Sequence, residues 1–506
     1  MGKCKVFILF TILFTLICIN ISPAEETAKI LLLYTNDIHG HIMPYEDSTI
    51  APAPEKIGGF QYLSTLIKNE RSKNPEGTLL LDGGDIAQGN LYSNMAYGIP
   101  VIELMNVIGY DGGVLGNHDF DWGEQKLVNM ISAAKFPLLA CNLIKMEDGS
   151  FIDGTIPYII KNINGIRIGI IGIACTDTSV LSAEINHGKF YFLSGEETLK
   201  YYIPVLKEIH KVNLIIVISH LGYEKDIELA DNISGIDIIV GSHSHKVIDT
   251  PVVKNNTIIL QAGKYLSCLG KLELEVDKNT KKIVSHKGEL VKILDSKIEA
   301  DREVEKLLDK YREKYENLGN KIIGETSVEL TKNNKEECNL GNLIADIIKI
   351  SAKSDIALIN TGGLREDIPK GKITMEKLYG VFPFENMIIS MDLKGKYIKD
   401  IVETCFTGNH AILQVSGLKI KYDSSKPDKE QVIEILVNNK PIQEEKNYRI
   451  ATVDFLAAGG DGYDEFKKGE NLQNVMFARD AIIKYFKEYS PVTDPIEGSL
   501  ENIESQ

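Results

Sequence analysis

Short apolar runs followed by aspartate, asparagine or histidine recur through the first half of this chain. Six such runs are predicted to be buried strands, at Ile30–Tyr34, Thr78–Leu81, Gly113–Leu115, Ile166–Ile173, Leu214–Ile218 and Ile236–Val240. Only Ile166–Ile173 lacks a polar cluster directly after it. Helix-like patterns separate several runs, at Phe60–Lys68, Pro100–Val107 and Glu124–Ala134. Strands that alternate with helices predict an α/β fold, which builds its sites at the carboxyl ends of strands.

Six of the ten histidines lie in these polar segments, close to aspartate and asparagine. This mixture of imidazole, carboxylate and amide ligands is typical of sites for divalent metal ions. Two ions about 3.5–4 Å apart share a ligand, and a carboxylate can bridge them where a neutral imidazole cannot. We therefore expect two divalent ions, with zinc or manganese favoured and cobalt, iron, nickel or magnesium as alternatives.

Some polar residues in these segments have simpler interpretations. Asp82 and His41 fit a cap or turn residue better than a metal ligand. His187, His210, His286 and His410 have no motif around them, and we expect them to be structural or exposed.

The first 24 residues have the features of a signal peptide. Lys3 and Lys5 precede an apolar stretch, and Ser22-Pro23-Ala24 offers the small residues that signal peptidase reads. A membrane anchor is the alternative, but the stretch is short and has polar interruptions. We expect an exported protein that is periplasmic, secreted or at the cell surface, with no transmembrane segment after cleavage.

The formal net charge of −15 disfavours a polyanionic partner such as DNA. A small phosphorylated substrate remains compatible, because bound metal ions supply local positive charge. The five cysteines that would remain after cleavage form no CxxC pair, which argues against a cysteine-rich zinc site.

The pattern changes near residue 297. Apolar residues between Val304 and Leu318 recur at helical spacing, and Gly319 ends the run, so one long amphipathic helix is predicted. It would connect two domains, although an ordinary surface helix is an alternative. We expect a metal domain at residues 25–297, the connecting helix at 298–320, a second α/β domain at 321–489 and a polar tail at 490–506.

Five motifs of the first half occur in a fixed order along the chain. They are Asp37-x-His39, Gly84-Asp85, Gly116-Asn117-His118, His220 and Gly241-x-His243-x-His245. In this order they resemble the motifs of the calcineurin-like metallophosphoesterases. The resemblance implies a four-layer β-sandwich flanked by helices. It also implies one ion on Asp37, His39 and His245, another on Asn117, His220 and His243, and Asp85 bridging the two.

The same resemblance implies how phosphoesters would be cleaved. His118 would stabilise or protonate the leaving oxygen, and Asp121 would orient its ring, with Asp119 as the rival partner. Attack would come from water activated by the two ions, without a serine or cysteine nucleophile.

The second half resembles the C-terminal, nucleotide-binding domain of the 5′-nucleotidase family. The resemblance rests on Glu337–Leu343, Asn360–Arg365, Phe382–Phe384 and Phe455–Tyr463. It implies that Phe384 and Phe455 stack on the base, although phenylalanines are more often core residues. Asn360 would contact the base edge, Asp461 the ribose hydroxyls and Arg365 the phosphate.

One position departs from the family pattern. Asn334 stands where an arginine is usual, four residues before Cys338, and Lys332 and Lys335 flank it. Lys335 could supply a less directional charge in its place.

Together these features predict an exported dinuclear 5′-nucleotidase that releases phosphate from nucleoside 5′-monophosphates. Alternatives with the same fold are a UDP-sugar hydrolase and a 2′,3′-cyclic nucleotide phosphodiesterase with 3′-nucleotidase activity. A nucleotide-binding surface protein without catalysis is the alternative of another class. The base preference and the oligomeric state stay open.

Overall fold

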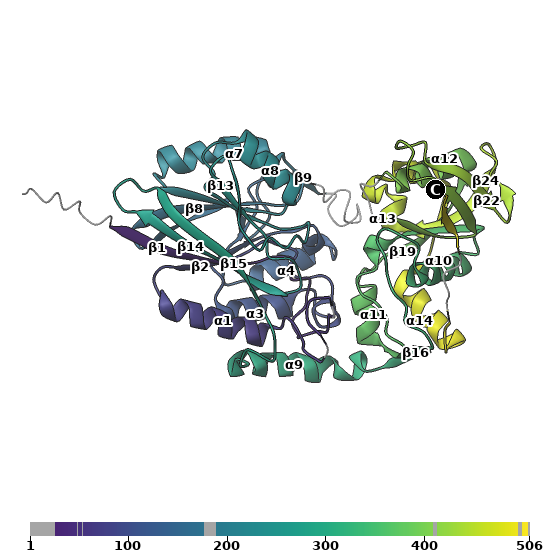
Figure 1. Ribbon diagram of the computed structural model, residues 1–506, viewed down its shortest axis with the longest axis horizontal. Coiled ribbons are helices and arrows are strands. Elements are labelled where there is room, and N and C mark those ends of the chain that lie inside the picture. Colours follow the sequence, from purple (N-terminus) through teal and green to yellow (C-terminus); the bar gives the residue numbers. More distant parts are fainter. Residues whose placement is uncertain are drawn as a thin grey trace, which may run out of the picture.

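Two β-sheets pack face to face in the N-terminal domain of the computed structural model (Figure 1). The structure describes residues 26–47, 49–52, 54–176, 189–407, 412–493 and 498–503. The predicted signal peptide, His187 and His410 lie outside these ranges.

The first sheet has seven strands in the order β15-β14-β1-β2-β3-β4-β6. Their bounds are β1 Thr27–Thr35, β2 Thr78–Asp82, β3 Gly112–Val114, β4 Leu138–Leu139, β6 Thr155–Ile156, β14 Cys268–Asp277 and β15 Ile283–Lys292. The second sheet has six strands in the order β12-β13-β11-β10-β8-β7. These are β7 Tyr158–Ile163, β8 Ile166–Ile173, β10 Leu214–Ser219, β11 Ile238–Gly241, β12 Val252–Lys254 and β13 Thr257–Leu260. A short pair, β5 (Leu143–Lys145) and β9 (Phe190–Phe192), lies apart from both sheets.

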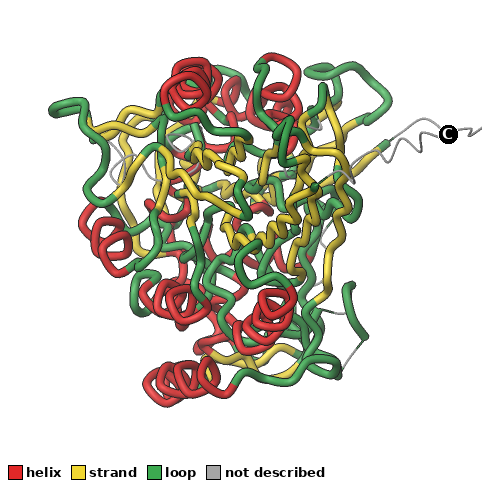
Figure 2. The backbone as a smooth tube through the Cα atoms, turned by 90° about the vertical axis from the view of Figure 1, so that its left-hand side faces the viewer, coloured by secondary structure: helices red, strands yellow, loops and turns green. Residues whose placement is uncertain are grey.

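Alternation along the buried strands builds four layers. In β1, Ile30 and Leu32 belong to the apolar cluster between the sheets, whereas Leu31 and Leu33 belong to the cluster under the first helix layer. That layer contains α1 (Phe60–Lys73), α3 (Ile99–Ile108) and α4 (Glu124–Ala133). Helices α7 (Gly195–Pro204) and α8 (Tyr223–Asn232) cover the other sheet. Figure 2 shows strands in the middle and helices outside them, so the predicted four-layer sandwich is confirmed.

Parallel pairing brings the ends of the central strands together. In β1 and β2, Thr35 pairs with Asp82, and in β10 and β11, Ser219 pairs with Gly241. The segments that follow these strands therefore emerge at one edge of the sandwich, which is where the polar clusters lie.

Helix α9 (Arg302–Gly319) leads from the first domain to the second along one side of the molecule (Figure 1). Asp301 caps its start by accepting a hydrogen bond from the backbone N–H of Glu303. Val304, Leu308 and Tyr311 are buried in the N-terminal core. The predicted long joining helix is thus present, and its apolar face packs on the first domain.

The C-terminal domain has a five-stranded sheet in the order β20-β17-β24-β19-β25, a four-stranded sheet β23-β22-β21-β26 and the pair β16-β18. The bounds are β16 Ile322–Thr326, β17 Ile356–Asn360, β18 Gly371–Thr374, β19 Met387–Lys394, β20 Leu413–Ser416, β21 Leu418–Tyr422, β22 Val432–Val437, β23 Lys440–Pro441, β24 Asn447–Val453, β25 Glu470–Phe477 and β26 Leu500–Asn502. The helices are α10 Asn339–Ala352, α11 Met375–Val381, α12 Gly395–Cys405, α13 Asp454–Ala457 and α14 Ala478–Tyr489.

Two contacts bring residues from outside the predicted bounds 321–489 into the C-terminal domain. Leu91, in the short helix α2 (Leu91–Asn94) of the first domain, is fully buried in the C-terminal core cluster. Strand β26, in the polar tail, pairs with β21 through Leu500 and Ile420. The tail thus forms the edge of a sheet.

No helix in the described ranges is long and apolar enough to cross a membrane. Cys141, Cys268, Cys338 and Cys405 are buried free thiols, and Cys175 is buried as well.

Candidate active site

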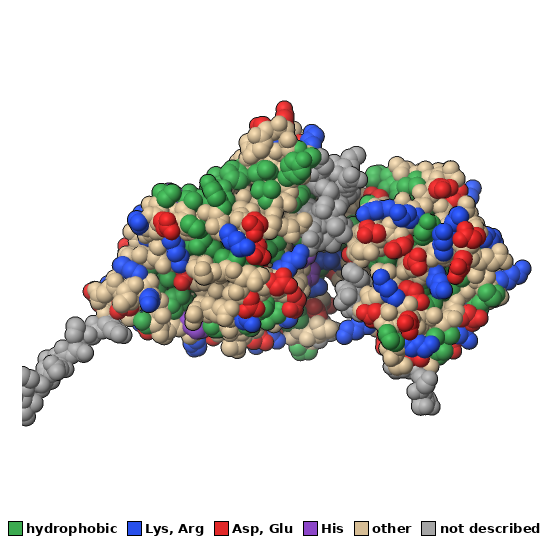
Figure 3. Space-filling model, turned by 90° about the horizontal axis from the view of Figure 1, so that it is seen from above, with side chains coloured by type: hydrophobic (Ala, Val, Ile, Leu, Met, Phe, Trp, Pro, Cys, Tyr) green, Lys and Arg blue, Asp and Glu red, His purple; other side chains and the backbone are tan. Residues whose placement is uncertain are grey.

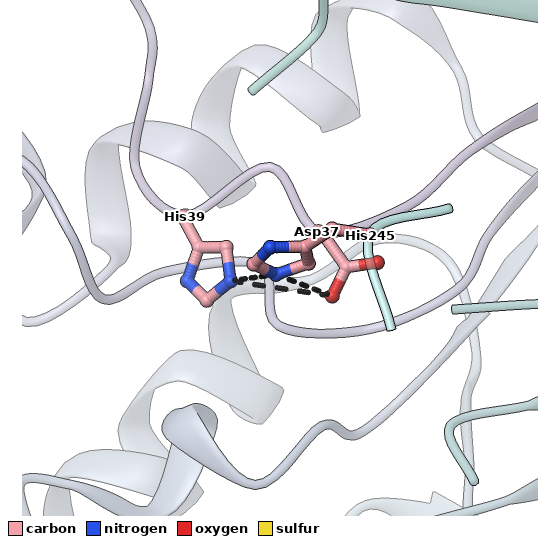
Figure 4. Close-up of side chains that lie close together, drawn as sticks. All are labelled: Asp37, His39 and His245. Atoms are coloured by element: carbon pink, nitrogen blue, oxygen red, sulfur yellow. Dashed lines mark hydrogen bonds and ion pairs between the residues drawn. The ribbon is translucent and has the colours of Figure 1, made fainter. Parts of the chain in front are cut away.

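Asp37, His39 and His245 converge where the polar segments meet (Figure 4). Nε2 of His39 lies 3.1 Å from Nε2 of His245, which is 3.4 Å from Oδ1 of Asp37. Their donor atoms all lie within 4.8 Å of one another. One carboxylate and two imidazoles at this spacing could hold one divalent ion.

A second group lies beside the first. Asp85, His220 and His243 also have donor atoms within 4.8 Å of one another. Oδ1 of Asn117 is 3.3 Å from Nε2 of His220, which adds the amide oxygen expected at this group. The structure therefore brings together all seven predicted ligands.

The carboxylate of Asp85 lies between the two groups. Its Oδ2 is 3.2 Å from Nε2 of His220 and 3.5 Å from Nε2 of His39. Asp85 is 1% exposed, and a buried carboxylate amid imidazoles needs positive charge to offset its desolvation. This donor set fits two divalent cations that share Asp85.

Hydrogen bonds to the backbone orient two of the imidazoles. Nδ1 of His39 is 2.9 Å from the carbonyl oxygen of Gln88, and Nδ1 of His220 is 2.7 Å from that of Gly83. A proton on Nδ1 would donate to each carbonyl and leave the Nε2 lone pair directed at the centre. Burial lowers the pKa of His39 well below its ordinary value, and Arg365 lowers it further against the opposing effect of Asp85. A neutral His39 ring is the form that binds metal.

Unusual backbone conformations present these side chains. Asp37, His39, Asp85, His243 and His245 all have positive φ, between 49° and 69°. Side chains other than glycine are strained in this region, and such residues cluster at functional sites. Gly84 has φ 91°, and a Cβ there would lie 2.8 Å from Nδ1 of His220. Residue 84, in the turn before Asp85, must therefore be glycine, because its φ is positive and because a Cβ would clash with the His220 ring.

His118 and its two neighbouring aspartates have separate contacts. Nδ1 of His118 lies 2.9 Å from Oδ2 of Asp121. Asp119 instead accepts hydrogen bonds from the backbone N–H groups of Ile86, Ala87 and Gly116. Burial lowers the pKa of His118, but the carboxylates of Asp121 and Asp85 outweigh it and raise the pKa above its ordinary value. The geometry pairs His118 with Asp121 and gives Asp119 a part in holding the Asp85 loop.

A cavity of about 230 Å³ joins the metal groups to the C-terminal domain. Asp85, Asn117, His118, His243 and His245 line one part. From the C-terminal domain, the lining includes Asn360, Arg365, Phe384, Phe455 and Asp461. The five predicted substrate-binding residues therefore line the same cavity as four of the predicted ligands, Asp85, Asn117, His243 and His245. Figure 3 shows the two domains as separate lobes with a groove between them.

Phe384 and Phe455 are only partly buried, whereas the neighbouring Phe382 is fully buried. The ring centroid of Phe384 lies 5.3 Å from that of His118 across the domain boundary. Nδ2 of Asn360 donates to Oδ2 of Asp461 over 2.7 Å. Two aromatic faces thus line the cavity beside an acidic, hydrogen-bonding group.

Arg365 also reaches across to the first domain. Its Nε donates to the hydroxyl of Tyr265 over 3.1 Å, and one terminal nitrogen lies 3.5 Å from Nε2 of His39. The ring of Tyr265 stacks on His41, with centroids 3.9 Å apart. His41 is therefore buried against an aromatic ring and lies outside both metal groups, as its interpretation as a non-ligand predicts.

Sequence reasoning missed three residues of this site. Gln88 and Trp122, the single tryptophan of the chain, both line the cavity, and Tyr265 holds Arg365. Trp122 directly follows Asp121, which is the only local signal for it. Gln88 and Tyr265 stand in no pattern that marks a site.

The departure at Asn334 leaves no direct substitute in the cavity. Asn334 and Lys335 are exposed. Burial and the nearby Lys264 lower the pKa of Lys332, with a smaller effect from Arg365. Lys332 is therefore close enough to Arg365 for the two charges to interact. Neither Lys332 nor Lys335 is among the residues that line the described cavity.

Comparison with known proteins agrees with this two-part site. Residues 30–247 match the calcineurin-like phosphoesterase model, and residues 320–468 match the 5′-nucleotidase C-terminal domain. The chain is 30% identical to a snake venom 5′-nucleotidase of Crotalus adamanteus over 96% of this chain and 90% of that protein. It is 29% identical to the trifunctional nucleotide phosphoesterase YfkN of Bacillus subtilis over 95% of this chain, which spans 35% of that protein.

A solved structure shares the whole architecture. The 5′-nucleotidase precursor from Thermus thermophilus superposes with a TM-score of 0.85 and 30% identity, over 94% of this chain and 100% of that one. With its metallophosphoesterase domain and its C-terminal domain both matched, this chain is a phosphoric monoester hydrolase that belongs to the 5′-nucleotidase family.

Proposed function

We propose that this protein is an exported dinuclear 5′-nucleotidase that hydrolyses nucleoside 5′-monophosphates to nucleoside and phosphate. The observation that carries the proposal is the single cavity lined by metal-ligating side chains and by two aromatic rings from the other domain. A phosphate at the ligand groups and a base between aromatic faces would fit one small nucleotide.

The metal ligands divide as the family resemblance implies. Asp37, His39 and His245 would hold one divalent ion. His220, His243 and the amide oxygen of Asn117 would hold the other, and Asp85 would bridge the two. When bound, the ions supply an activated water and positive charge for the phosphoryl oxygens. Zinc or manganese suits this donor set best, and cobalt, iron, nickel or magnesium are alternatives.

His118 is the proposed catalytic residue at the leaving oxygen. Its ring lines the cavity and its Nδ1 is bonded to Asp121. A proton held on Nδ1 by that carboxylate fixes the tautomer, so Nε2 can carry a second proton to the departing alkoxide. The raised pKa of His118 favours this doubly protonated form.

The C-terminal domain would bind the nucleoside and orient it. Phe384 and Phe455 would stack on the base, each contact contributing about 1–3 kcal/mol. Asp461 would accept hydrogen bonds from the ribose hydroxyls. Asn360, which donates a hydrogen bond to the Asp461 carboxylate, would contact the base edge. Arg365, anchored by Tyr265, would donate to the phosphate in its forked geometry.

Two further features belong to the proposal. Cleavage after residue 24 would release a mature protein outside the cytoplasm, with domains at 25–297 and 321–489 joined through residues 298–320 and a tail at 490–506. A UDP-sugar hydrolase, a 2′,3′-cyclic nucleotide phosphodiesterase with 3′-nucleotidase activity and a non-catalytic nucleotide-binding protein are the competing functions.

Asp85→Asn tests the proposal. We expect phosphate release from AMP to collapse by at least a hundredfold and metal content to fall, while the C-terminal domain still binds nucleotide. Asp82→Asn is the matched control, because Asp82 is equally buried at the end of β2, three residues before Asp85, but bonds to Thr35 and the backbone of Gly84. A substrate panel of nucleoside mono-, di- and triphosphates, UDP-glucose and 2′,3′-cyclic AMP separates the competing functions. Undiminished turnover in Asp85→Asn would exclude a dinuclear mechanism.

A further inference from the structure

The side-chain amide of Gln88 is buried, and its nitrogen donates no hydrogen bond to any described residue. The residue is 2% exposed and lines the cavity, in the loop three residues after Asp85. Its side-chain Nε2 is inaccessible to water and has no hydrogen-bond partner among the described residues. A buried amide without an acceptor is costly, so such a group in a native cavity points to an absent partner.

The backbone around Gln88 is held in place. Its carbonyl oxygen lies 2.9 Å from Nδ1 of His39. At Gly89 a Cβ would lie 2.5 Å from the carbonyl oxygen of His39, so the chain passes too close for any side chain there. The N–H groups of Ile86 and Ala87 donate to Asp119. The backbone that carries the Gln88 side chain is therefore held in a fixed position beside the cavity.

The surroundings of Gln88 indicate which chemical group its amide would bind. Its cavity neighbours include Asp85, Asn117 and His118, which form the metal end, while the aromatic rings of the C-terminal domain come from the other lobe. The amide NH₂ offers two donors without a charge, and it therefore complements an oxygen acceptor. At the metal end of the cavity, the acceptor that the proposed reaction brings is a phosphoryl oxygen.

From this geometry we propose that Gln88 is a substrate-binding residue whose Nε2–H group donates to a non-bridging oxygen of the phosphoryl group. The inference rests on the proposed function and adds a neutral donor to the phosphate site. Negative charge on the non-bridging oxygens would be shared with bound ions and Arg365, and the Gln88 amide would add an uncharged donor to this site.

Two substitutions test the hydrogen bond in the metal-loaded protein. Gln88→Met keeps the side-chain length and removes the donor, and Gln88→Glu replaces it with an acceptor that repels phosphate. We expect Gln88→Met to lower kcat/KM for AMP about 10- to 100-fold. Binding of inorganic phosphate, measured by calorimetry, should weaken by a similar factor, and Gln88→Glu should lose more in both measurements.

The controls separate phosphate binding from folding and from metal binding. Gln61→Met is the matched variant, because Gln61 is a buried glutamine that also has an unpartnered amide atom and lies outside the cavity. It should leave kinetics and phosphate binding unchanged. Adenosine binding and metal content should be unchanged in Gln88→Met, and the thermal midpoint should not fall, because an unpartnered buried amide is removed.

Two results would overturn the inference. One is unaltered phosphate binding by Gln88→Met, and the other is a loss of bound metal that accounts for its lower activity. Failure of the proposed function looks different: the wild type would then release no phosphate from any nucleoside monophosphate. The proposed hydrogen bond from Gln88 to phosphate could still be tested in that case, because inorganic phosphate binding needs no nucleotide.

Discussion

The hydroxyl of Tyr265 accepts a hydrogen bond from Nε of Arg365 over 3.1 Å, and this contact joins the two domains beside the metal groups. It orients the guanidinium so that a terminal nitrogen lies 3.5 Å from Nε2 of His39. The residue expected to bind phosphate is thus positioned by a side chain of the opposite domain. A phosphate contact made in this way depends on how the domains are placed.

Tyr265→Phe should therefore raise KM for AMP about 3- to 10-fold, because one hydrogen bond to a charged group is lost while the stacked ring remains. Steady-state kinetics and the thermal midpoint measure this. Tyr158→Phe removes a comparable hydroxyl, bonded to His210 far from the cavity, and should leave KM unchanged. An unchanged KM in Tyr265→Phe would show that Arg365 is positioned without this hydrogen bond.

His118 and Asp121 give a prediction that depends on the leaving group. His118→Asn should lower kcat for AMP by about 10²- to 10⁴-fold, because the departing ribose alkoxide needs a proton. With 4-nitrophenyl phosphate the loss should be much smaller, since nitrophenolate leaves without protonation. Asp121→Asn should show the same dependence in weaker form, because Nδ1 loses its carboxylate partner. Equal losses with both substrates would indicate that His118 acts elsewhere in the reaction.

The convergence of the candidate ligands was predictable because these residues closely follow buried strands. His220 comes one residue after β10 and His243 two residues after β11, and these strands are parallel neighbours. Apolar runs define the strands, parallel pairing puts their carboxyl ends at one edge, and the residues that follow must converge. Order along the chain then identifies the motifs.

The remaining site residues depend on tertiary placement that a sequence pattern does not encode. Gln88 and Tyr265 are single polar or aromatic residues in loops, and each matters only because of a partner far along the chain. The positive φ angles at Asp37 and His39 likewise follow from packing between loops. Strand β26 could not be foreseen in a polar tail, because its pairing with β21 spans about 80 residues of intervening chain.

Stacking of a base on Phe384 and Phe455 predicts a substrate-dependent loss of affinity. Phe384→Leu should raise KM for AMP about 5- to 100-fold, which corresponds to about 1–3 kcal/mol of stacking. Glycerol 2-phosphate, which has no base, should be hydrolysed with little change. Phe486→Leu is the matched control: Phe486 is fully buried in the C-terminal core and lies outside the cavity, so its loss should lower the free energy of unfolding and leave KM intact. Equal effects of Phe384→Leu on both substrates would argue against stacking.

A buried carboxyl in helix α8 predicts how stability depends on pH. Burial raises the pKa of Asp226 from 3.8 to about 8, with only partial opposition from the Ser219 hydroxyl and His220. The carboxyl lies directly against β11, since a Cβ at Gly241 would overlap its Oδ2. The folded protein therefore keeps a proton here that the unfolded chain releases above pH 4. Consequently the free energy of unfolding should fall by roughly 1 kcal/mol per pH unit between about pH 4 and pH 8 from this group alone.

Asp226→Asn removes that titration and should flatten the dependence. Urea unfolding of metal-saturated protein at pH 5 and pH 8 measures the difference between the two slopes. The exposed Asp428→Asn should keep the slope of the wild type. The variant should gain stability relative to the wild type at pH 8 and little at pH 5, because a neutral amide has no charge to desolvate. Parallel slopes for Asp226→Asn and the wild type would mean that Asp226 titrates near its unfolded value, and that solvent reaches this carboxyl through motion of α8.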